Sequence, residues 1–131
     1  MHIKSKGKRG DDMADKIALD IEFVRGDSYE RGFIIRDKGT GSTVETTWDD
    51  VYFTVKKKYL DRDFKFQKRL SDGGIVYDGD GHFTLSILPE DTNDLSFGDY
   101  DCDIELKKGT YTRTFYGHLH LTPEVTHQNN E

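Results

Sequence analysis

Two histidines near the end of the chain have a spacing that suits metal binding. His118 and His120 are two residues apart in an alternating segment, so an extended strand turns both imidazoles to the same face. Imidazole is a common zinc ligand, but a site also needs a third ligand and groups that orient the first ones. His82 and His127 are further donors, and nothing in the sequence brings either of them near. We therefore interpret His118 and His120 as solvent-facing, and we predict neither a bound metal nor a cofactor.

Aromatic side chains are the second group that could act in recognition. A ring on the surface of a sheet can stack on a sugar or anchor a protein interface. The chain contains 8 Phe, 7 Tyr and 1 Trp, and core packing accounts for part of them. Candidates for exposed rings are Tyr59, Tyr77, Tyr111 and the three that we select as candidate binding residues, Trp48, Tyr52 and Tyr116.

Two short motifs have simpler structural explanations. Arg25-Gly26-Asp27 is the tripeptide that integrins bind, but it falls where the chain needs a turn between two strands. Asp78 and Asp80 resemble the start of a calcium loop. The sixth and twelfth positions of that loop, however, are Phe83 and Pro89 instead of Gly and Glu. A tight hairpin with positive-φ residues explains the Asp-Gly pairs better.

The sequence contains no recognisable catalytic motif, and we predict that the protein is not an enzyme. Cys102 lies among acidic residues and on the inward side of its strand, which raises the pKa of a thiol and makes it a poor nucleophile. A nucleophile elbow, a phosphate-binding glycine loop and a His-Glu-x-x-His helix are all missing from the sequence. The many carboxylates fall at turns and exposed strand positions, where solvation accounts for them.

Composition favours strands and short turns over helices. Only two alanines occur against 13 glycines, and 18 Asp stand against 7 Glu. Alanine is the strongest helix former, aromatic residues favour strands, and Asp bonds to nearby backbone in turns.

Alternation of apolar and polar residues then predicts seven or eight strands, near residues 17–23, 29–36, 51–55, 64–70, 75–77, 83–87, 99–106 and 111–121. We predict an antiparallel two-layer β-sandwich, with a partly open barrel as the alternative.

The sequence has room for one domain, which we place at residues 15–125 between a basic N-terminal tail (1–14) and a polar C-terminal tail (126–131). A net charge of −6 disfavours nucleic acid as a partner. The longest apolar run, Phe33-Ile34-Ile35, is too short for membrane insertion, and no secretory signal is recognisable. One cysteine permits no internal disulfide, so a reducing compartment is expected.

One segment makes the sandwich immunoglobulin-like. Tyr100 lies two residues before Cys102 and follows a corner that begins at Leu88-Pro89-Glu90-Asp91-Thr92. In immunoglobulin domains a tyrosine with this spacing bonds back to upstream backbone. The chain departs from that pattern because it has no second cysteine, and because Trp48 lies outside a clear strand.

Several segments together resemble a small protein family encoded in prophages of Gram-positive bacteria. They include Phe23-Val24-Arg25-Gly26-Asp27-Ser28-Tyr29, Val51-Tyr52-Phe53-Thr54-Val55-Lys56-Lys57, Phe66-Gln67-Lys68, Tyr100-Asp101-Cys102-Asp103-Ile104-Glu105-Leu106 and the closing residues 117–126. The resemblance implies a non-enzymatic structural module of a virion, in the tail, the baseplate or a capsid accessory. Its partners would be other virion proteins or a host-surface component, and assembly with copies of itself is left open. The alternative function is a carbohydrate-binding module that uses exposed aromatic rings.

Overall fold

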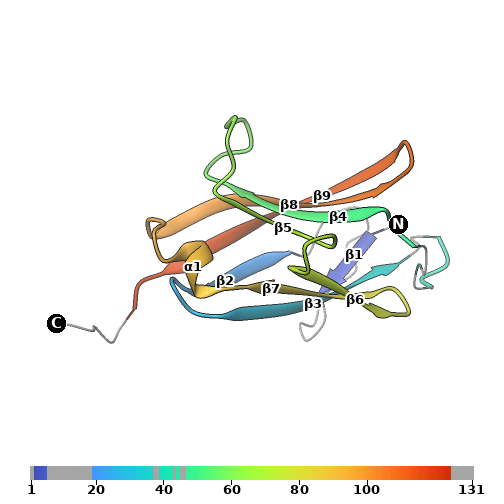
Figure 1. The fold of residues 1–131 in the computed structure, drawn as a ribbon, viewed down its shortest axis with the longest axis horizontal. Helices are drawn as coiled ribbons and strands as arrows, with labels where there is room; N and C mark the ends of the chain where they lie inside the picture. Colours follow the sequence, from blue (N-terminus) through green and yellow to red (C-terminus); the bar gives the residue numbers. More distant parts are fainter. Residues whose placement is uncertain (1, 6–18, 37–38, 43, 45–46, 125–131) are drawn as a thin grey trace.

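The computed structural model describes residues 2–5, 19–36, 39–42, 44 and 47–124, and these form two facing sheets (Figure 1). The first sheet has the order β1 (His2–Ser5), β3 (Tyr29–Arg36), β7 (His82–Ile87) and β6 (Ile75–Gly79). The second has the order β2 (Asp20–Val24), β9 (Tyr111–Thr122), β8 (Gly98–Lys108), β4 (Asp50–Lys56) and β5 (Phe66–Arg69). A single turn of helix, α1 (Pro89–Thr92), connects β7 to β8. The protein is therefore an all-β sandwich, with separate sheets in place of the alternative barrel.

Alternation along the strands decides which side chains form the core. In β4, Val51, Phe53 and Val55 are fully buried, whereas Tyr52 and Thr54 face outward and are only partly covered. The same period of two governs β7, β8 and β9, whose inward residues meet between the sheets. Among the described residues, no helix has the length and apolar character that a membrane span requires.

Pairing at one edge corrects the prediction of a wholly antiparallel sandwich. β2 runs parallel to β9, with Asp20 beside His118 and Val24 beside Thr122. Because β2 and β3 belong to different sheets, residues 25–28 cross between the layers instead of closing a hairpin. Alternation specifies the buried face of a strand but not the direction of its neighbour, so the sequence could not reveal this pairing.

The N-terminal segment is a second correction. Residues 2–5, predicted to belong to a tail, form β1 and pair antiparallel with β3, from His2 beside Arg36 to Ser5 beside Phe33. The rest of the predicted tail, and the predicted C-terminal tail at 126–131, lie outside the described residues.

The strand order and the corner before β8 both follow the immunoglobulin arrangement. The orders β1–β3–β7–β6 and β9–β8–β4 match those of the two sheets of immunoglobulin domains, with β2 and β5 added at the two edges of the second sheet's usual three strands. The buried hydroxyl of Tyr100 donates a hydrogen bond to the carbonyl oxygen of Ser96 at 2.8 Å, which confirms the predicted corner. Cys102 is buried and free, and Phe53 occupies the inner face of β4 where those domains carry a tryptophan.

The Arg25-Gly26-Asp27 segment is a turn, as predicted, and it is fastened to the corner around α1. The amide of Gly26, at φ +85°, donates to Thr92 Oγ1 at 2.8 Å, and Arg25 Nη1 donates to the carbonyl oxygen of Leu95 at 3.1 Å. The guanidinium of Arg25 also lies 4.2 Å from the ring centre of Phe97. These contacts give the arginine a structural role in joining the two layers.

Candidate functional site

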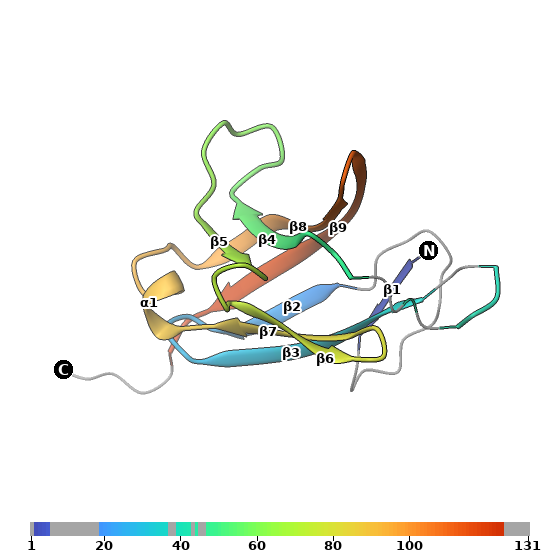
Figure 2. The ribbon, with the colours of Figure 1, turned by 45° about the vertical axis from the view of Figure 1, so that its right-hand side comes forward.

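Acidic side chains, two histidines and a tyrosine gather on the outward side of the five-stranded sheet. We call it the acidic face and define it by eleven of the outward residues of β2, β9, β8 and β4, namely Asp20, Glu22, Thr54, Lys56, Asp99, Asp101, Asp103, Glu105, Tyr116, His118 and His120. The loop of residues 57–65 joins β4 to β5 and projects beyond the sheets (Figures 1 and 2). The face and the loop together enclose a hollow of about 310 Å³, lined by Thr54, Lys56, Tyr59, Leu60, Asp101, Cys102, Asp103 and Tyr116.

Strand register brings the lining residues of the hollow together. Asp103 of β8 is paired with Thr54 of β4 on one side and with Tyr116 of β9 on the other. Asp101, one step along the same face, pairs with Lys56 and with His118. Cross-strand neighbours lie close enough for side-chain contact, so three strands build one continuous surface.

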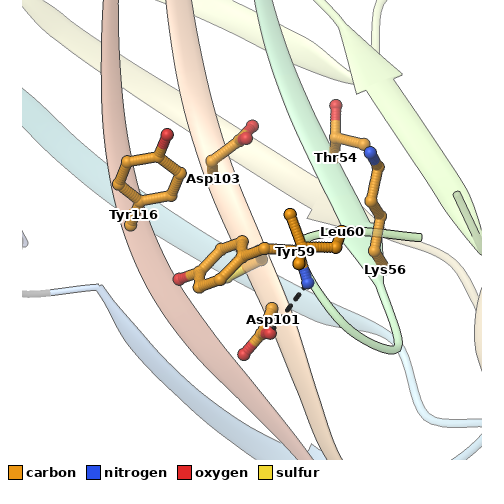
Figure 3. A pocket seen from close by; sticks show the side chains of 8 residues that line it. Thr54, Lys56, Tyr59, Leu60, Asp101, Asp103 and Tyr116 are labelled. Carbon is orange, nitrogen blue, oxygen red and sulfur yellow. Dashed lines mark hydrogen bonds between the residues drawn. The ribbon is translucent and has the colours of Figure 1, made fainter. Parts of the chain in front are cut away.

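Two hydrogen bonds, one from its backbone amide and one from its hydroxyl, fix Tyr59 over this surface. Its backbone amide donates to Asp101 Oδ2 at 3.0 Å, and its hydroxyl donates to the carbonyl oxygen of Gly117 at 3.1 Å. The ring meets Tyr116 edge to face, with centroids 4.9 Å apart and planes at 78° (Figure 3). Burial, followed by the charge of Asp101, raises the pKa of Tyr59 to about 12, so its hydroxyl remains a proton donor at neutral pH.

Asp103 differs from the other carboxylates of the acidic face. It is partly buried, and neither of its oxygens has a hydrogen-bond partner within the described part of the chain. Burial, together with the nearby charge of Glu105, raises the pKa of Asp103 to about 6, against the opposing charge of Lys56. Asp103 thus lies in the hollow beside Tyr59 and Tyr116, and its two oxygens are acceptors that the described part of the fold does not use (Figure 3).

The two histidines lie on one face of β9, as predicted, and each has carboxylates on both sides. Across β2 and β8, His118 is paired with Asp20 and Asp101, and His120 is paired with Glu22 and Asp99. His120 Nδ1 hydrogen-bonds Asp99, while His118 Nδ1 lies 3.5 Å from Asp101 Oδ1. The hydrogen bond from His120, supported by its charge, lowers the pKa of Asp99.

The structure does not assemble a metal site around these histidines. Among the described residues, no three His, Cys, Asp or Glu side chains are arranged to hold a metal ion. His82 is occupied elsewhere, because its Nδ1 lies 2.9 Å from the carbonyl oxygen of Asp80 in the β6–β7 hairpin. The other predicted donor, His127, lies outside the described residues.

The three candidate aromatic binding residues lie in three different environments. Trp48 is 6% exposed and belongs to the core, so its prediction as a binding residue is wrong. It precedes β4 and packs at the end of the sandwich against Tyr111, with ring centroids 6.2 Å apart. Tyr52 faces outward, but its ring is covered by the guanidinium of Arg69 at 4.5 Å. Tyr116 is 56% exposed and lines the hollow.

Sequence reasoning overlooked the residues that surround Tyr116. It treated the carboxylates of β8, Asp101 and Asp103 among them, as solvated residues. Lys56 lies on β4, between β8 and β5. Its ammonium donates to the carbonyl oxygen of Asp61 at 2.9 Å and helps to shape the loop. A regular alternation of acids through residues 99–105 was the available signal for this face.

Comparison with known proteins adds information on the fold. No protein-family model and no curated protein matches the sequence. Among solved structures, the chain is similar to an endo-β-1,4-mannanase from Thermotoga petrophila, with a TM-score of 0.52 and 11% identity over 80% of this chain. It is also similar to a chimeric titin Z1Z2, with a TM-score of 0.35 and 11% identity over 79% of this chain. The chain spans 18% of the mannanase chain and 43% of the titin chain. At such identity the likeness to the mannanase structure shows a shared β-sandwich fold and nothing about activity.

Proposed function

We propose that the protein is a non-enzymatic interaction module of a phage or prophage virion, and that the acidic face with loop 57–65 is its recognition surface. The observation that carries the recognition role is the hollow beside Tyr59 and Tyr116, which contains the partly buried carboxylate of Asp103, without a partner among the described residues. The virion role is supported by the resemblance of the quoted segments to prophage-encoded proteins. On this proposal the chain is in the bacterial cytoplasm before assembly and in the virion afterwards.

The surroundings of the hollow have the composition of a binding surface. Leu60 is 97% exposed at its rim, and Phe64 of the same loop is half exposed. Tyrosine is enriched at interfaces, and apolar anchors surrounded by polar groups commonly dominate binding energy. A phosphate backbone would be repelled by the carboxylates of this face, so a protein or a glycan is a better partner than nucleic acid.

The same geometry supports binding in preference to hydrolysis. Glycoside hydrolysis commonly needs two carboxyl groups, one to donate a proton and one to act as a base or nucleophile. Asp101 is held by the amide of Tyr59 and by His118, which leaves Asp103 as the unengaged carboxylate in the hollow. Burial raises the pKa of the Cys102 thiol, so this group is not poised as a nucleophile either.

Co-sedimentation tests the virion role. Particles induced from the bacterial strain that encodes the chain are separated on a density gradient, and fractions are probed with an antibody against the purified protein. We expect the chain in the fractions that contain intact particles. A chain found only among soluble lysate proteins would contradict the proposal.

Thiol labelling of the same particles tests whether the recognition surface is open. The native chain contains one cysteine, Cys102, which is buried and serves as an unlabelled background. A Leu60→Cys variant adds an exposed thiol beside the hollow. We expect a maleimide reagent to label this variant both in the free protein and in intact particles. Labelling in the free protein alone would mean that the face is covered by the virion.

A further inference from the structure

We propose that the hollow beside Tyr59 and Tyr116 binds a neutral, hydroxyl-rich sugar unit of a glycan. The inference deepens the recognition role of the acidic face and rests on that proposed function. It takes the partner of this face to be a glycan of the host surface. The argument depends on the size of the hollow, on its rings, and on the mixture of hydrogen-bonding groups around it.

Size and rings suit a small ring-shaped ligand. A volume of about 310 Å³ is at the lower end of the range for small-molecule sites. Tyr116 is more than half exposed, and Tyr59 is 38% exposed although its hydroxyl and amide are both fixed. Rings that are already held in place can stack on the apolar C–H face of a sugar with little loss of side-chain entropy.

Unused hydrogen-bonding capacity faces the same space. Asp103 offers two acceptor oxygens without a partner among the described residues. The ammonium of Lys56 has three protons and donates one to the carbonyl oxygen of Asp61. Thr54 Oγ1 accepts from Gln67 Nε2 at 2.9 Å, which leaves its own hydroxyl proton to donate. A hydroxyl group can accept from the lysine and donate to the carboxylate, which an acceptor-only or a donor-only ligand cannot do.

The charges disfavour an anionic ligand and give no clean site for a cationic one. Asp101 and Asp103 repel an anion, and the ammonium of Lys56 in the same hollow offsets part of their attraction for a cation. The lysine therefore weakens the case for the simplest alternative, a basic side chain of a partner protein, and the lysine probe below tests that alternative. A neutral polyhydroxylated molecule is the class that uses both kinds of group without a charge conflict.

Titration of the full chain, followed by amide chemical shifts, tests the proposal. The neutral probes are cellotriose, β-1,4-mannotriose, galactobiose and chitotriose, which differ in hydroxyl configuration and in the acetamido group. The charged probes are N-acetyl-lysine methylamide and glucuronate. We expect at least one neutral probe to give saturable shifts confined to residues 54–61, 101–103 and 116–117, and the charged probes to give none. No saturation with any neutral probe at 20 mM, or tighter binding of the lysine probe, would overturn the inference.

Matched variants locate the site. Tyr116→Ala should weaken the best neutral probe about tenfold, because ring stacking of about 1.4 kcal/mol is lost. Asp103→Asn, which keeps the shape but removes the charge, should weaken it about fivefold. Tyr111→Ala removes a similarly exposed tyrosine at the far end of β9 and should leave affinity unchanged. Equal losses in the two tyrosine variants would contradict a site at Tyr116.

The outcomes separate this inference from the proposed function. Co-sedimentation of the chain with particles, combined with no sugar binding, would remove the sugar site and leave the virion role intact. Sugar binding without co-sedimentation would keep the site and remove the virion role.

Discussion

The two faces of β8 have opposite character within a single strand. The inward residues Tyr100, Cys102, Ile104 and Leu106 are at most 2% exposed, whereas the outward residues alternating with them are Asp99, Asp101, Asp103 and Glu105. Burial of each large apolar side chain stabilises the fold by about 1.5–3 kcal/mol. Four acidic side chains about 7 Å apart on one face repel one another and contribute no comparable gain. The comparison indicates that the inward face specifies the sandwich and that the outward face is available for recognition.

The largest expected effect lies on the inward face. Ile104→Ala removes a fully buried side chain between the sheets and should lower the free energy of unfolding by about 2–5 kcal/mol. Urea denaturation followed by circular dichroism measures this change. Truncation of the outward neighbour, Glu105→Ala, is the matched control and should change stability by about 0.5 kcal/mol or less. Equal losses in the two variants would remove the distinction between the faces.

Gly117 lies on the inward face of β9, at a position where the neighbouring backbone leaves no room for a side chain. A methyl group at this position would overlap the carbonyl oxygen of Leu19 and lie 3.0 Å from the Cβ of Leu19. That carbonyl accepts the amide of His118 at 3.1 Å, next to the parallel pairing of β2 with β9. Gly117→Ala should therefore cost about 1–3 kcal/mol and reduce amide protection in β2 during hydrogen exchange. Thr112→Ala, an exposed change on the same strand, should leave both unchanged.

Loss of the tyrosine hydroxyl at the corner before β8 should have a smaller effect on the free energy of unfolding. Tyr100→Phe removes the hydroxyl that bonds the carbonyl oxygen of Ser96, and it leaves that oxygen with one partner fewer. A loss of about 1–2 kcal/mol in unfolding free energy is expected from chemical denaturation. A cost near zero would mean that the corner is held by apolar packing alone.

On the outward face, removal of a charge should raise the free energy of unfolding instead of lowering it. The pKa of Asp103 is raised in the folded state, from 3.8 to about 6, so its protonated form stabilises the fold. That stabilisation is complete below pH 4 and is lost as the pH rises through 6. Asp103→Asn should therefore stabilise the protein by about 1–2 kcal/mol at pH 7.5, after allowance for solvent screening, and have little effect at pH 4. Thermal unfolding at the two pH values measures the difference, and a gain that is independent of pH would contradict the assigned cause.

Much of the sandwich could be predicted because its signals are local. Alternation located β4, β7, β8 and β9, and the hairpin at Asp80-Gly81 has the two positive φ values, +55° and +78°, that Asp-Gly pairs favour. The tyrosine spacing before Cys102 predicted a hydrogen bond that the structure contains. Each of these features depends on residues close together in the chain.

The remaining features depend on distant residues, and the sequence did not reveal them. Trp48 appeared exposed because it lies outside a strand, but the end of the sandwich closes over it and Tyr111 stacks on it. The hollow forms because Tyr59 reaches across to Gly117, 58 residues away in the chain. Strand periodicity correctly placed Tyr116 outward, but it could not show which carboxylate would lie beside this ring without a partner.

Binding to cells tests the central claim, that the outward face around Tyr116 recognises a partner while the inward face holds the fold. Fluorescently labelled wild-type protein, Tyr116→Ala and Tyr111→Ala are compared for binding to cells of the strain that encodes the chain, and the stability of each is measured separately by urea denaturation. We expect Tyr116→Ala to unfold within about 0.5 kcal/mol of the wild type and to bind about tenfold more weakly, with Tyr111→Ala binding normally. Wild-type binding by Tyr116→Ala, or equal weakening of both variants, would contradict the account.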